Sequence, residues 1–102
     1  IVLNTPNNPA GSHIDRPTLE AIGTLAERHN AIVLADEVWE AMTWDGAEHV
    51  SALSIPALRD RTIKIGSAGK IFSLTGWKVG WACGAPALVE AVAASHQFLT
   101  FT

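Results

Sequence analysis

Short apolar runs at residues 1–5, 31–35 and 62–66 constrain the fold of this chain most strongly. Each run contains Ile, Val or Leu, is too short for a buried helix, and ends near turn-forming residues, which is typical of buried strands. A helical pattern over residues 16–29 separates the first two runs. A strand, a helix and a second strand in this order predict a right-handed crossover between two parallel strands. The chain is therefore predicted to have an α/β fold with a mostly parallel sheet.

The helix predicted at residues 16–29 has start and stop signals of its own. Asp15 is placed to cap its first turn, Pro17 fits inside that turn, and Asn30 suits its C-terminal end. Its apolar face is formed by Leu19, Ile22, Leu25 and Ala26. A second amphipathic helix is predicted from Pro86 onward. Its apolar positions are Leu88, Val89, Val92, Ala93, His96 and Leu99.

Residues 79–83 form a fourth apolar run, close behind the run at 62–66. Too few residues separate the two for a helix to cross back over the sheet, so the last strand is predicted to be antiparallel to its neighbour. Residues 36–61 are less regular, with a turn at 44–46 and about one helical turn at 55–60.

Charge and composition exclude several classes of function. The net charge is −3, with seven scattered basic residues and ten acidic ones, so no nucleic-acid partner is predicted. The sequence has no uncharged apolar stretch of about 18 residues and no visible signal peptide, so no membrane partner is predicted and a cytoplasmic location is expected. No metal site is predicted either, because the four histidines lack metal-ligand spacing. The lone Cys83 is interpreted as a buried, reduced thiol.

The first residues suggest that the 102-residue chain is an excerpt of a longer protein. It opens inside the apolar run Ile1-Val2-Leu3 without an initiator methionine. Apolar residues make up 48% of the chain and charged residues only 17%, which predicts surfaces that further segments cover.

Polar residues follow three of the predicted strands. Asn8 follows the first strand, Asp36 the second, and Ser67 and Lys70 the third. Since the carboxyl ends of parallel strands meet at one edge, where such sheets bind ligands, these side chains are expected to converge. The small residues before Lys70 leave backbone N–H groups and a hydroxyl for an anion. Apolar neighbours would disfavour the charged form of Lys70, so its amine could attack a carbonyl and form a Schiff base.

Simpler interpretations of these residues exist. Most lysines that follow a strand are solvated loop residues, and Asp36 could cap a helix or form an ordinary ion pair. A nucleotide-binding phosphate loop is excluded because Lys64 and Ile71 stand where its motif requires glycine and a hydroxyl residue.

Three segments, read in order, resemble successive signatures of the pyridoxal-phosphate-dependent class I and II aminotransferases. They are Asn4-Thr5-Pro6-Asn7-Asn8-Pro9-Ala10-Gly11, Asp36-Glu37-Val38-Trp39 and Ser67-Ala68-Gly69-Lys70. Residues 44–51 and 75–81 look like the branch that acts on kynurenine, methionine or glutamine, and succinyl-diaminopimelate aminotransferases look similar too. The resemblance implies that residues 1–102 are the central part of the large domain of the aspartate-aminotransferase-like fold, a three-layer α/β/α domain.

The resemblance also implies roles for individual residues. Lys70 would hold pyridoxal 5'-phosphate as a Schiff base and later move a proton as a base. Asp36 would keep the pyridine nitrogen protonated, so that the ring can accept electrons. Asn8 would hydrogen-bond the ring oxygen, with a cis bond to the proline that follows it. Ser67 and Lys78 would bind the phosphate.

Trp39 departs from the family pattern. The family usually has a tyrosine here, whose phenol donates to the cofactor's ring oxygen, whereas an indole offers only an N–H on a larger ring. Either the indole replaces the phenol imperfectly or this hydrogen bond is lost. Cofactor binding is still expected in both cases, and the property in question is the pKa of the Schiff base with Lys70. Glu37 is interpreted as a charge at the surface or behind the site, and Trp77 and Trp81 as core packing.

The activity implied by the resemblance is transfer of an amino group between an amino acid and a 2-oxo acid. The parent protein would be a homodimer, and the excerpt alone is expected to be inactive. Two alternatives stay open at this point: a carbon–sulfur β-lyase on the same scaffold, and the cofactor-sensing effector domain of a transcription regulator.

Overall fold

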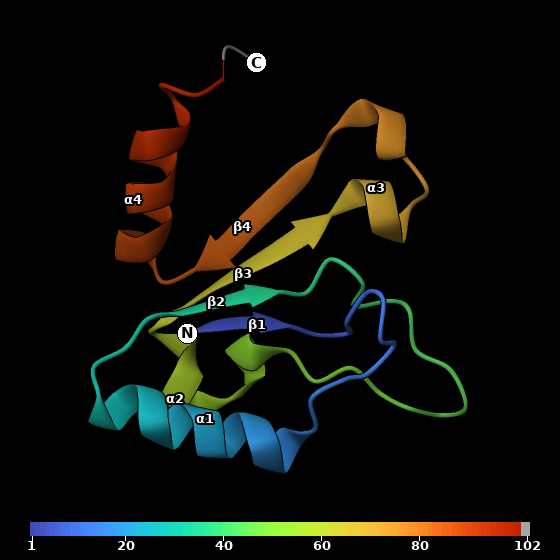
Figure 1. Cartoon of the computed structure of the whole chain (residues 1–102). Coiled ribbons are helices and arrows are strands. Elements are labelled where there is room, and N and C mark those ends of the chain that lie inside the picture. Colours follow the sequence, from blue (N-terminus) through green and yellow to red (C-terminus); the bar gives the residue numbers. More distant parts are fainter. Residues whose placement is uncertain (101–102) are drawn as a thin grey trace.

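The computed structural model describes residues 1–100, which form a four-stranded sheet flanked by helices. The strands lie in chain order: β1 (Val2–Asn4), β2 (Val33–Asp36), β3 (Thr62–Ser67) and β4 (Gly80–Gly84). β1, β2 and β3 are parallel, and β4 runs antiparallel to β3 (Figure 1). This confirms the predicted sheet, including the antiparallel last strand.

Helix α1 (Arg16–Arg28) begins and ends where its sequence signals predict. The amide of Thr18 donates a 3.0 Å hydrogen bond to the Asp15 carboxylate, and Pro17 lies in the first turn. Asn30 adopts a left-handed conformation, with φ of 47°, just past the end. The remaining helical segments are η1 (Ala52–Ser54), α2 (Pro56–Arg59), α3 (Ala68–Ile71), η2 (Thr75–Trp77) and α4 (Pro86–His96).

The core lies between the sheet and the helices α1 and α2, which cover the lower face in Figure 1. Alternation along β2 turns Val33 and Ala35 toward these helices and leaves Asp36 on the opposite face. Gly23 lets α1 approach α2 closely, because a Cβ atom at this position would lie 3.0 Å from Cβ of Ala57. The buried apolar cluster comprises Leu3, Leu19, Ala26, Val33, Ala35, Ala52, Ile55 and Leu58.

Helix α4 lies on the other side of the sheet, against β3 and β4 (Figure 1). The prediction that it is amphipathic is wrong, since none of its residues is buried and Leu99 lies beyond its end. The reason is its sequence, Pro-Ala-Leu-Val-Glu-Ala-Val-Ala-Ala-Ser-His, which places small or apolar residues all round the helix. Over residues 1–100, no helix is long and apolar enough to cross a membrane.

Two burial predictions near β4 are also wrong. Cys83 is exposed because β4 is the edge strand and no described element covers this side chain. Trp77 is 74% exposed, because η2 projects from the sheet as a loop. Trp81 is partly buried and packs across Gly66, where a Cβ atom would collide with its indole ring.

Candidate active site

The carboxyl ends of the three parallel strands are level with one another. Asn4 of β1 pairs with Asp36 of β2, and Asp36 pairs with Ile65 of β3. The three strands therefore end at the same edge of the sheet. Asp36 and Ser67 are the last residues of β2 and β3, and Asn8 and Lys70 lie on the segments that follow β1 and β3.

A cavity of about 420 Å³ opens at this edge, and its polar lining includes Ser67, Lys70 and Lys78. Ser67 ends β3, Lys70 lies on α3, and Lys78 follows η2 in a left-handed conformation with φ of 56°. Two amines and a hydroxyl around one cavity suit an anionic ligand. The remaining lining residues are Val38, Ile65, Gly66, Gly69, Thr75, Val79 and Gly80.

Lys78 reaches this cavity because the segment after α3 folds back onto the end of β3. The Thr75 hydroxyl donates a 3.2 Å hydrogen bond to the Gly69 carbonyl, and the Ala68 amide donates a 3.1 Å bond to the Val79 carbonyl. A Cβ atom at Gly69 would lie only 3.2 Å from Cα of Thr75. The small residue before Lys70 thus permits the close approach that brings the two lysines to one cavity.

The surroundings of Lys70 differ from those expected. Phe72 and Trp77, its apolar neighbours in the sequence, are 63% and 74% exposed and do not enclose its amine. Instead, Nζ of Lys70 lies 4.8 Å from the ring centre of Trp39, a cation–π contact. Such contacts contribute about 0.5–1 kcal/mol at exposed sites and more when water is excluded.

Asn8 lies in a neighbouring cavity of about 240 Å³. Trp39 lines this second cavity, and its ring also contacts the amine of Lys70, which lines the first. The Asn8–Pro9 peptide bond is cis, as the resemblance implied, and the Thr5–Pro6 bond is cis as well. The other residues that line this cavity are Pro6, Asn7, Pro9, Gly11, Met42 and Trp44.

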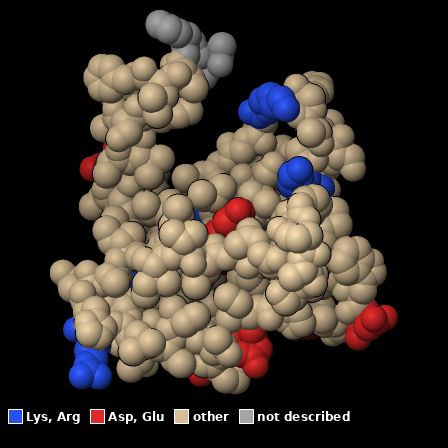
Figure 2. Space-filling model, viewed as in Figure 1, with Lys and Arg blue, Asp and Glu red and all other residues tan. Residues whose placement is uncertain are grey.

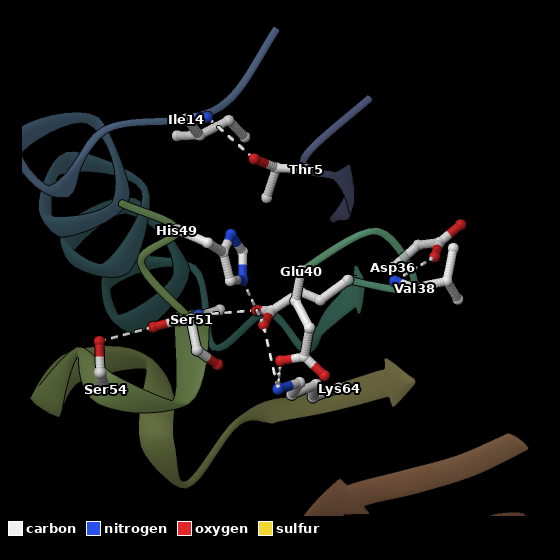
Figure 3. Close-up of polar contacts among 11 residues, drawn as sticks. Thr5, Ile14, Asp36, Val38, Glu40, His49, Ser51, Ser54 and Lys64 are labelled. Atoms are coloured by element: carbon white, nitrogen blue, oxygen red, sulfur yellow. Dashed lines mark hydrogen bonds and ion pairs between the residues drawn. The ribbon is translucent and has the colours of Figure 1, made fainter. Parts of the chain in front are cut away.

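Asp36 lines neither cavity, although its neighbour Val38 lines the one that contains Lys70. The Asp36 carboxylate is half-buried and accepts a 3.3 Å hydrogen bond from the Val38 amide (Figure 3). No basic side chain within residues 1–100 forms an ion pair with it. Asp36 therefore keeps a carboxylate oxygen available for a cationic ligand group.

Sequence reasoning missed a buried group of charged side chains on the opposite face of β2 and β3. We call it the Glu37 network, and Figure 3 labels its members Glu40, His49 and Lys64. Glu37 is fully buried, and its carboxylate accepts hydrogen bonds from His49 Nε2 at 2.9 Å and from the Ala52 amide at 2.8 Å. Nζ of Lys64 lies 3.5 Å from the same carboxylate and also contacts Glu40. The interpretation of Glu37 as a surface charge is wrong, because its side chain is fully buried, and its interpretation as a charge behind the site stays a prediction.

Burial and hydrogen bonding shift the pKa values of Glu37 and Lys64 in opposite directions. Burial alone would raise the pKa of Glu37, but hydrogen bonds from His49 and the Ala52 amide outweigh it and lower the pKa below its ordinary value. Burial alone would lower the pKa of Lys64, but its hydrogen bond to Glu40 and the charges of both carboxylates raise it. Both side chains are therefore held in their charged forms at neutral pH.

The network should make stability depend on pH. A lowered carboxyl pKa contributes stability above the ordinary pKa of glutamate, and this contribution is lost as pH falls through the lowered value. Glu37→Ala is therefore expected to reduce the free energy of unfolding by about 3–5 kcal/mol at neutral pH, because His49 and Lys64 lose their buried partner. The difference from wild type should shrink in acid. Thermal unfolding of the intact protein across pH measures it.

Glu20→Ala is the matched control for this prediction. Glu20 pairs with Arg16 at 3.8 Å on the surface of α1, with side chains 55% and 52% exposed. Its replacement should cost less than about 1 kcal/mol. A Glu37→Ala effect as small as this, or one equally large in acid, would contradict the role given to Glu37.

Comparisons with known proteins agree with the resemblance read from the motifs. The family model for aminotransferase class I and II matches residues 1–102. The chain is 45% identical over 101 residues to kynurenine–oxoglutarate transaminase 1 of Homo sapiens, which covers 99% of this chain and 24% of that protein. It is also 45% identical over 104 residues to kynurenine–oxoglutarate transaminase of Dictyostelium discoideum, covering 100% of this chain and 24% of that protein.

Comparison with solved structures also finds an aminotransferase. N-succinyldiaminopimelate aminotransferase from Mycobacterium tuberculosis superposes with a TM-score of 0.95 at 40% identity, covering 99% of this chain and 26% of that one. The chain thus spans about a quarter of the length of the relatives it matches. With a family match over its full length and this likeness in fold, the chain belongs to the aminotransferase class I and II family.

Proposed function

We propose that this chain is the central part of the large domain of a longer, pyridoxal-phosphate-dependent aminotransferase. That enzyme would transfer an amino group between an amino acid and a 2-oxo acid. One observation carries the proposal: Ser67, Lys70 and Lys78 line one cavity at the sheet edge where Asp36 also lies. The three relatives described above are named transaminases or aminotransferases, and this favours amino-group transfer over carbon–sulfur lysis or sensing.

The donor set fits this cofactor. Ser67 and Lys78 offer a hydroxyl and a positive charge for its phosphate, and Lys70 offers an amine for its aldehyde. Asp36 offers a carboxylate with no basic partner among the described residues, as a protonated ring nitrogen requires. Asn8 is assigned to the ring oxygen. When bound, the cofactor supplies a ring that accepts electrons from the substrate's α-carbon.

The chain's own residues would then act as follows. The Lys70 amine would bind the cofactor covalently and, once released by the substrate amine, move a proton from and to the substrate. The Asp36 carboxylate would keep the ring nitrogen protonated. The Trp39 ring, 4.8 Å from Nζ of Lys70, would orient that amine. The homodimer and the cytoplasmic location stay predictions.

Chemical trapping tests the proposal. The full-length protein, loaded with pyridoxal 5'-phosphate and reduced with borohydride, should carry a pyridoxyl group on Lys70. Mass spectrometry of its peptides locates the group, and a parallel assay measures amino transfer to 2-oxo acids. A label on Lys64 or Lys78 instead, or a loaded protein that transfers no amino group to any 2-oxo acid, would overturn the proposal.

Trp39→Tyr should lower the pKa of the Schiff base between Lys70 and the cofactor, so that the absorbance change of the loaded protein occurs at lower pH. A phenol at this position would donate a hydrogen bond to the cofactor's ring oxygen, which an indole N–H on a larger ring does not match. The fold should stay intact, because both side chains are planar aromatics. Spectra recorded across pH measure the shift. Trp77→Tyr is the control, since Trp77 is 74% exposed and lines neither the Lys70 cavity nor the Asn8 cavity, and a shift equal in both variants would contradict the assignment.

A further inference from the structure

An ion pair between Glu40 and Lys64 joins the turn after β2 to strand β3 (Figure 3). The side chains of Glu40 and Lys64 are only 24% and 15% exposed. Water screens the pair less than it screens a surface pair. The contact is therefore suited to fix one segment against another.

Lys64 is not needed to complete the hydrogen bonds of Glu37. One Glu37 oxygen accepts from the Ala52 amide at 2.8 Å and the other from His49 at 2.9 Å, whereas Nζ of Lys64 stays 3.5 Å away. The closer partner of Lys64 is Glu40. Glu40 belongs to the turn and not to the core. The pair therefore does more than balance a buried charge, because it links the turn to β3.

The turn that carries Glu40 also carries Trp39. Two backbone hydrogen bonds shape it, from the Glu40 amide to the Glu37 carbonyl at 2.9 Å and from the Met42 amide to the Trp39 carbonyl at 2.7 Å. Both lie within residues 37–42. The start of this segment is held to the sheet by the Glu37 amide, which donates a 3.0 Å hydrogen bond to the Ile65 carbonyl of β3. Among the hydrogen bonds and ion pairs of residues 1–100, only the Glu40–Lys64 pair connects residues 38–42 to β3.

We propose that Glu40 is a positioning residue for the site around Lys70. Held by Lys64, it fixes the turn so that the Trp39 ring stays against the Lys70 amine, 4.8 Å from ring centre to Nζ. The inference rests on the proposed function, in which that amine reacts. The Glu40–Lys64 pair and the Trp39–Lys70 contact each join residues that are distant in the sequence.

Glu40→Ala in the full-length holoenzyme tests the proposal. The substitution removes the ion pair that links residues 38–42 to β3. It leaves the hydrogen bond from the Glu37 amide to the Ile65 carbonyl in place and leaves Lys64 paired with Glu37. Turnover should fall about tenfold, because the Lys70 amine loses its orientation. Glu48→Ala, an exposed glutamate in the loop that follows the turn, is the matched control and should leave turnover unchanged.

A double-mutant cycle separates positioning from a general loss of structure. In a Trp39→Leu background the ring contact is already gone, so Glu40→Ala should have little further effect on turnover. Any effect on thermal stability should be the same in both backgrounds. An equal loss of turnover with and without the Trp39 ring would overturn the proposal.

Hydrogen exchange gives a readout that does not depend on activity. In Glu40→Ala the amides of residues 38–42 should exchange faster than in wild type, while those of α1 stay unchanged. Unchanged exchange at 38–42 would overturn the inference even in an active enzyme. If the wild-type protein transfers no amino group, the proposed function fails by itself, and the exchange data still decide whether Glu40 holds the turn.

Discussion

Replacing Lys70 with alanine in the full-length protein should reduce amino-group transfer by at least about four orders of magnitude, since one side chain supplies both the covalent attachment and the base. The protein should still bind pyridoxal 5'-phosphate noncovalently. Ser67 and Lys78 line the same cavity and remain in place, and Asp36 stays at the sheet edge. Steady-state rates measure the loss, and equilibrium dialysis measures the retained cofactor.

Lys78→Ala is the informative comparison for Lys70→Ala. Lys78 lines the same cavity but is assigned to the phosphate, so its loss should weaken cofactor affinity and be overcome by excess cofactor. The Lys70→Ala defect should persist at any cofactor concentration. If the two variants behaved alike, with both rescued by excess cofactor, Lys70 would be a phosphate ligand and not the reacting amine.

Asp36→Ala should reduce the rate of a single half-reaction by about three orders of magnitude. A carboxylate beside the ring nitrogen stabilises the charge that makes the ring an electron acceptor, and such electrostatic contributions are among the largest in catalysis. The fold should survive, because among residues 1–100 the Asp36 side chain makes one hydrogen bond, from the Val38 amide at 3.3 Å, and the backbone bond from the Thr5 amide to the Asp36 carbonyl does not depend on that side chain. Stopped-flow absorbance of the loaded protein, mixed with amino acid, measures the rate.

Asp60→Ala controls for the general effect of removing a carboxylate. Asp60 is exposed and directly follows α2, on the side of the sheet away from Asp36. Its replacement should leave the half-reaction rate unchanged. A normal rate in Asp36→Ala would remove Asp36 from the site, and an equal loss in both variants would point to a structural defect instead.

Elements with local signals could be predicted from the sequence. Asp15 and Pro17 mark the start of α1 because capping depends on residues within one turn. The gathering of polar segments at one edge follows from strand order alone, because parallel strands end on the same side. The antiparallel β4 follows from the shortness of its connection.

Contacts between distant segments could not be predicted in this way. Trp39 meets Lys70 across 31 positions, and no periodicity reports such a contact. The Glu37 network needs partners from three segments, although one signal was present. Glu37 continues the inward-facing series of Val33 and Ala35, so alternation alone marks it as a buried charge.

The two adjacent carboxylates at the end of β2 have a consequence for which sequence changes this strand can accept. Asp36 and Glu37 point to opposite faces, one toward the edge assigned to the cofactor and one into the core among His49, Ala52 and Lys64. Inserting or deleting one residue in β2 would exchange the two faces and turn every side chain of the strand over. The site and the core would then be lost together. Variation in length is therefore confined to the loops, and this strand can evolve only by substitution.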